Sequence, residues 1–119
     1  MIVVPAFDIQ TWQDGPCTVV RAEGELDMMV APRLTAEIDR ILEGSDHPCL
    51  VLDLTHVPFC DSVGLGALVG ALSGTRDVQG RLILVVSSGM ISRLLAITSL
   101  DRHFETCSSL HEAVEHVAA

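Results

Sequence analysis

Short apolar runs alternate along the chain with longer segments in which apolar residues recur every three or four positions. The runs predict β-strands, and the periodic segments predict amphipathic α-helices. Strands are expected over residues 3–12, 17–22, 50–54, 81–87 and 102–106, and helices over 31–42, 62–73, 88–97 and 110–117. The resulting order is strand, strand, helix, followed by three further strand–helix pairs.

This order predicts an α/β protein. Strand–helix–strand units need right-handed crossovers and mostly parallel neighbours. The turn signal Asp14-Gly15-Pro16 between the first two strands predicts an antiparallel hairpin at one edge. The nearly continuous apolar run 50–54 is typical of a strand that is covered on both faces. We therefore expect a small mixed β-sheet of four to five strands packed with about four α-helices, in a single domain over residues 1–119.

The charge balance restricts the kinds of partner. The chain has a net charge of −9, and all seven of its basic residues are Arg. An acidic surface without a basic run repels phosphate backbones and anionic headgroups, so neither nucleic acid nor a membrane is an expected partner. The same charge favours a basic partner protein. The other interpretation is that the charge only keeps the domain soluble.

The four cysteines, at positions 17, 49, 60 and 107, include no C-x-x-C spacing. The first residues lack the charged and apolar segments of a secretory signal. The longest apolar run, at 82–86, is far too short to span a bilayer. We therefore expect free, buried thiols in a reducing cytoplasm.

The stretch 50–74 joins a buried strand through a short loop to a helix rich in Gly and Ala. Ser62 falls at the start of that helix, where backbone N–H groups are unpaired and the helix dipole is positive. A serine oxygen is favourable there, and a phosphate is more so. Two simpler interpretations stay open: Asp61 is a helix N-cap or N-terminal acid, and Ser62 is only a capping serine.

Catalytic chemistry has little support. The segment 60–64 (CDSVG) is similar to a nucleophile elbow, but it lacks the first Gly, and no His–acid pair can be assigned to a hydrolase serine. Gly64 and Gly66 lie inside the predicted helix, so the phosphate cradle of a dinucleotide loop is absent. His and Cys residues are scattered without metal-ligand spacing. We expect no enzymatic activity, no cofactor and no metal.

Three segments carry a combined pattern: 24–27 (GELD), 50–54 (LVLDL) and 57–66 (VPFCDSVGLG). Together they resemble the STAS domain of anti-sigma factor antagonists. The downstream residues Gly80-x-Leu82, 93–95 (RLL) and 99–100 (SL) are similar to the later pattern of that family. The resemblance covers nearly the whole chain.

The resemblance implies a STAS-like fold and a protein that is not an enzyme. Unphosphorylated members of the family bind an anti-sigma factor, which is also a serine kinase with its own bound ATP, and so release a sigma factor. The kinase phosphorylates the serine of the D-S-x-G-L box, here Ser62, and a serine phosphatase restores binding. By position, Asp61 is the flanking acid and Asp27 is a loop acid expected near Ser62. The implied partner-binding residues are Asp27, Asp61, Ser62, Val63, Gly64 and Leu65.

Phosphorylation would add about −1.5 to −2 charges at pH 7 beside Asp27 and Asp61. We expect a local electrostatic switch with little change in fold. Gly64 and Gly66 are expected to keep the helix start slim enough for a kinase cleft to approach. The resemblance also allows an alternative, a STAS scaffold or transport-complex accessory subunit that is never phosphorylated.

Overall fold

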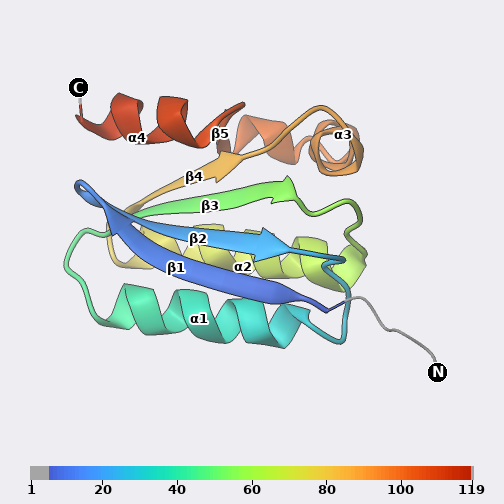
Figure 1. Cartoon of the computed structure of the whole chain (residues 1–119), viewed down its shortest axis with the longest axis horizontal. Coiled ribbons are helices and arrows are strands. Elements are labelled where there is room, and N and C mark those ends of the chain that lie inside the picture. The colour runs from blue at the N-terminus through green and yellow to red at the C-terminus, as the bar shows by residue number, and fades with distance from the viewer. Residues whose placement is uncertain (1–5, 119) are drawn as a thin grey trace.

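The computed structural model describes residues 6–118 and has a five-stranded mixed sheet at its centre (Figure 1). The strands lie side by side in chain order; β1 is antiparallel to β2, and the other neighbours are parallel. The predicted α/β class and the edge hairpin are therefore confirmed. The elements are β1 (Asp8–Asp14), β2 (Cys17–Glu23), α1 (Ala31–Glu43), β3 (Cys49–His56), α2 (Ser62–Asp77), β4 (Arg81–Val85), α3 (Met90–Ile97), the 3-10 turn η1 (Leu100–Arg102), β5 (Glu105–Cys107) and α4 (Leu110–Ala118).

Helices cover both faces of the sheet. α1 and α2 lie together against one face, and α4 lies on the opposite face (Figure 1). Alternate residues of β3 enter two cores: Leu50, Leu52 and Leu54 pack with α1 and α2, whereas Val51 packs with α4. Burial on both sides explains the unbroken apolar run of this strand. Among the described residues, no helix is long and apolar enough to cross a membrane.

The differences from the predicted elements lie mostly in the last third of the chain. The strand predicted over 102–106 is wrong in its first half, because Leu100–Arg102 form a 3-10 turn and only Glu105–Cys107 pair with β4. The Leu100 carbonyl accepts hydrogen bonds from the backbone N–H groups of both His103 and Phe104. These turn hydrogen bonds keep residues 102–104 out of the sheet, although the predicted strand included them.

Other boundaries shift by a few residues. β4 ends at Val85 and α3 begins at Met90, because Gly89, with φ of 155°, breaks the chain direction between them. α2 continues to Asp77, beyond its predicted end. The first strand begins at Asp8; residues 3–5 of its predicted range lie outside the described part of the chain.

Candidate partner-binding site

Two loops at the carboxyl ends of β2 and β3 form one continuous structure. Leu26 pairs with Cys60 in a parallel bridge outside the main strands. The Leu26 N–H donates to the Phe59 carbonyl at 2.9 Å, and the Asp61 N–H donates to the Leu26 carbonyl at 3.2 Å. The loop after β2 is thereby fixed to the start of α2, and both motifs of the sequence analysis meet at one end of the sheet (Figure 1).

Asp61 holds this junction together. Its Oδ1 accepts a hydrogen bond from the Gly64 N–H at 2.7 Å, which makes Asp61 the N-cap of α2. Its Oδ2 accepts from the Met28 N–H at 2.8 Å, across the gap between the two loops. The N-cap interpretation of Asp61 is confirmed. The hydrogen bond from Met28 to its second oxygen, which joins the two loops, was not predicted from the sequence.

Ser62 is the first residue of α2, and its side chain is exposed. The interpretation of Ser62 as the capping serine is wrong, because Asp61 occupies the cap position. The Ser62 hydroxyl therefore does not cap the helix, and it is accessible to another protein. Its position, one residue beyond a capping carboxylate, is also the positive end of the α2 dipole.

Gly64 has an internal role. A Cβ built at this position would lie 2.3 Å from the Leu26 carbonyl oxygen and 2.9 Å from the Cys60 Sγ. No side chain fits there, so glycine is required for the loop to reach the helix. The expectation that Gly64 serves the approach of a kinase is therefore not needed to explain it. At Gly66 an added Cβ would meet nothing within 4 Å, so that position is open to solvent.

The six predicted partner-binding residues differ in accessibility. Ser62 and Val63 are exposed, Asp27, Asp61 and Leu65 are half-buried, and Gly64 is buried. The Asp27 carboxylate is turned toward its own loop, where its Oδ1 accepts from the N–H groups of Met29 and Val30 at 2.9 and 3.3 Å. The loops bring these residues to one end of the fold, but of the six only Ser62 and Val63 have exposed side chains.

Three exposed apolar side chains near Ser62 were missed by the sequence analysis. Met28 and Met29 are 63% and 78% exposed, and Phe59 is 39% exposed. They lie on the same two bridged loops as the acids. The signal that could have found them is a pair of Met residues placed in a loop, between the GELD motif and the helix-starting Pro32, where no core residue is needed.

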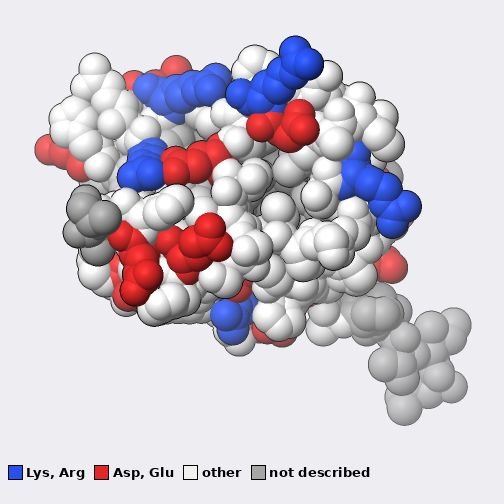
Figure 2. Space-filling model, turned by 90° about the horizontal axis from the view of Figure 1, so that it is seen from above, with Lys and Arg blue, Asp and Glu red and all other residues white. Residues whose placement is uncertain are grey.

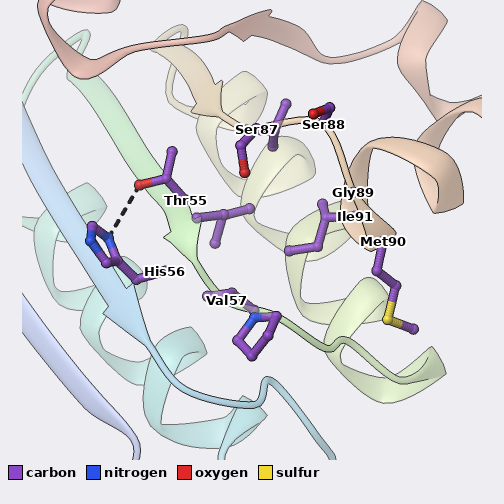
Figure 3. Close-up of a pocket in the computed structure, with 11 residues that line it drawn as sticks. Thr55, His56, Val57, Ser87, Ser88, Gly89, Met90 and Ile91 are labelled. Atoms are coloured by element: carbon purple, nitrogen blue, oxygen red, sulfur yellow. Dashed lines mark hydrogen bonds between the residues drawn. The ribbon is translucent and has the colours of Figure 1, made fainter.

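Apart from the surface around Ser62, a hollow of about 370 Å³ opens between the ends of β3 and β4 and the start of α3 (Figure 3). Thr55, His56 and Ser87 contribute polar atoms to its lining, and Thr55 Oγ1 lies 3.2 Å from His56 Nδ1. Ser62 does not line this hollow. In the described residues no group of three His, Cys, Asp or Glu side chains could hold a metal ion.

A half-buried ion pair between Arg21 and the buried Asp53 joins β2 to β3 near the site. Asp53, 2% exposed, accepts from Arg21 Nε at 3.0 Å and from the Thr55 hydroxyl at 2.7 Å. Burial by itself raises the pKa of Asp53, but the hydrogen bonds from Thr55 and the ion pair with Arg21 outweigh it, so the pKa lies below its usual value. The carboxylate therefore stays charged at neutral pH and keeps this end of the sheet in place.

Charges on the face covered by α4 are mixed. Basic and acidic side chains alternate there without forming an extended basic patch (Figure 2). Arg81, for example, is paired with Glu105 at 2.6 Å. This face offers no surface of the kind that binds phosphate backbones.

The STAS domain family model matches residues 8–113, and the chain belongs to the STAS domain family. It is 39% identical over 80 residues to the anti-sigma-B factor antagonist of Listeria monocytogenes, a match that covers 66% of this chain and 68% of that protein. It is 30% identical over 94 residues to the anti-sigma-B factor antagonist of Staphylococcus aureus, covering 79% of this chain and 86% of that one.

Solved structures agree with this assignment. An anti-sigma factor antagonist from Mycobacterium paratuberculosis superimposes with a TM-score of 0.86 at 28% identity, over 99% of this chain and 100% of that one. STAS anti-sigma factor antagonists are regulatory binding proteins and not enzymes, which rules out the hydrolase interpretation of Ser62.

Proposed function

We propose that this STAS domain is an anti-sigma factor antagonist, and that the surface around Ser62 binds the anti-sigma factor. The relatives named as antagonists support the role. The observation that carries the site is the exposure of Ser62 at the start of α2, next to exposed Val63. A partner docked there sequesters the hydroxyl and the apolar side chains together, and the sigma factor is released.

The partner is proposed to be a serine kinase that carries its own ATP, and Ser62 is its phosphoacceptor. A phosphate on Ser62 would stand beside the Asp61 carboxylate, which both of its hydrogen bonds hold in place. The added charge, about −1.5 to −2 at pH 7, is tolerated at a helix N-terminus, so the domain stays folded. A partner surface fitted to a neutral hydroxyl would instead meet two adjacent negative groups and lose affinity.

A serine phosphatase completes the cycle by restoring the neutral hydroxyl. The partner uses cellular ATP, so the proposal places the domain in the cytoplasm. No feature of the described residues favours the alternative of an unphosphorylated scaffold over this switch.

Phosphorylation is tested by incubating the protein with the anti-sigma factors of its source organism, purified one at a time, and ATP. Intact-mass spectrometry is expected to show a gain of one phosphate on the wild type and on Ser73→Ala, a control that removes another exposed serine of the same helix. Ser62→Ala is expected to gain none. No gain on the wild type with any anti-sigma factor, or an equal gain on Ser62→Ala, contradicts the proposed phosphoacceptor.

The charge mechanism is tested by binding affinity. Ser62→Asp is expected to weaken binding about a hundredfold, since juxtaposed like charges in an interface cost several kcal/mol. Ser62→Asn, of nearly the same size but neutral, separates charge from bulk. Equal losses in the two variants would mean that shape, and not charge, controls docking.

A further inference from the structure

A shallow groove of about 550 Å³ lies between α1 and α2 on the face that the sheet does not cover. Its lining is mostly apolar and includes Pro32, Ala36 and Asp39 on α1 and Val63, Gly66 and Gly70 on α2. Val63 directly follows Ser62 and belongs both to the groove and to the proposed docking surface, so the two are continuous. A partner that covers Ser62 therefore reaches the groove without leaving the surface of the domain.

The exposed apolar residues extend this surface. Met28 and Met29 precede α1 and are among the most exposed large apolar residues in the described part of the chain, and Val63 is 47% exposed. Apolar side chains gathered around a groove mark a binding surface more often than side chains scattered singly. Val63 lines the groove, and Met28 and Met29 lie in the loop just before Ala31 and Pro32, which also line it.

The charged side chain that lines the groove is acidic. Asp39 lines it, whereas the three arginines of α1 and α2 are bound elsewhere. Arg33 donates to the Phe7 carbonyl at 3.2 Å, Arg40 pairs with Glu37 at 2.8 Å, and Arg76 donates to the His103 carbonyl at 3.3 Å. Asp39 is therefore left facing a partner without a cation from its own helices, which favours a basic side chain on that partner.

We propose that the groove binds a second segment of the same anti-sigma factor, an apolar stretch with a basic residue placed opposite Asp39. The inference rests on the proposed function and assigns it an additional contact area. The basic residue matches the acidic groove, and the apolar stretch matches the lining that Val63, Ala36 and Gly70 provide. Docking at Ser62 and docking in the groove thus belong to one event.

Two variants test the groove in binding assays with the anti-sigma factor that phosphorylates the wild type. Gly70→Leu fills it, and an added Cβ at Gly70 meets nothing within 4 Å, so the substitution forces no backbone shift at that atom. Asp39→Lys reverses its charge. Each is expected to weaken binding at least tenfold. The controls are Ser73→Leu, exposed on the same helix, and Asp101→Lys, which makes the same charge change on η1; both are expected to bind within twofold of wild type.

The outcomes separate the two proposals. If the wild type binds and Ser62→Asp does not, but both groove variants bind like wild type, the groove inference is wrong and the proposed function stands. If the wild type binds no anti-sigma factor, both are overturned. Sedimentation of the free protein tests whether the groove instead binds a second copy of this chain. If the wild type is a dimer and Gly70→Leu is a monomer, the groove is a dimer interface and the inference is overturned. Circular dichroism and urea unfolding confirm that each variant is folded.

Discussion

Replacing Gly64 by Ala puts one methyl group into the contact that joins the two loops of the site. The new Cβ would lie 2.3 Å from the Leu26 carbonyl oxygen and 2.9 Å from Leu26 Cγ. The first of these neighbours is backbone, so a side-chain rotation cannot relieve the overlap. The start of α2 must move away from Leu26, and the hydrogen bonds that Leu26 makes with Phe59 and Asp61 must lengthen.

The cost follows from these contacts. Forcing one extra methyl into a packed site destabilises by about 1–3 kcal/mol. Each of the two hydrogen bonds that Leu26 makes with Phe59 and Asp61 contributes about 1 kcal/mol, and lengthening them loses part of that stabilisation. Ala gains about 1 kcal/mol over Gly in a helix, which offsets part of the loss. The net destabilisation of Gly64→Ala is expected to be about 2 kcal/mol, and in a domain of this size the melting temperature falls by about 8 °C.

Urea unfolding followed by Trp12 fluorescence and circular dichroism measures the change. Gly66→Ala and Gly70→Ala are matched controls in the same helix, since an added Cβ at either position meets nothing within 4 Å. Both are expected to stabilise the protein by about 0.5–1 kcal/mol. If Gly64→Ala were as stable as these controls, the close packing of α2 against Leu26 would not be the reason for that glycine.

Three further outcomes are expected. Asp61→Ala should destabilise by about 1–2 kcal/mol in urea unfolding, with a smaller loss for Asp61→Asn, which keeps a capping oxygen. Arg21→Met leaves the Asp53 carboxylate buried without its cation and should cost about 3 kcal/mol at pH 7. The Asp53 pKa is lowered in the wild type, so the stabilisation from its carboxylate is present above the unfolded-state pKa of about 3.9 and is lost as pH falls through the folded value. The difference in free energy of unfolding between the wild type and Arg21→Met should therefore shrink on acidification. A difference that does not change with pH would contradict the ion-pair account. Burial raises the pKa of Cys49 to about 12 and that of Cys60 to about 11. At pH 8 iodoacetamide should therefore label these two thiols more than about a hundredfold more slowly in the native protein than in urea. Equal labelling rates would show that the thiols are accessible in the native protein.

Much of the fold could be predicted because its strongest signals are local. The apolar run of β3, the 3.6-residue pattern of α1 and the turn at Asp14-Gly15-Pro16 each specify an element within a few residues. The N-cap at Asp61 is equally local. The 3-10 turn at Leu100–Arg102 escaped prediction because three residues with one apolar side chain carry no periodic signal.

The features that build the site are long-range, and the sequence could not reveal them. The Leu26–Cys60 bridge joins residues far apart in the chain, and it alone explains why Gly64 cannot carry a side chain. The second hydrogen bond of Asp61, to Met28, depends on the same approach of the loops. The resemblance identified Ser62, but its accessibility became clear only when Asp61 was seen to fill the cap.

The strand order also bears on how a ribosome makes this protein. Because β1 to β5 are neighbours in the order of synthesis, each strand that emerges can pair with the one released just before it. Of the described elements α4 is made last, and until it is released Val51 and Ile83 lack their cover on that side of the sheet. The risk of aggregation is therefore greatest before α4 has left the ribosome, and a nascent chain stalled before α4 is the species that most needs a chaperone.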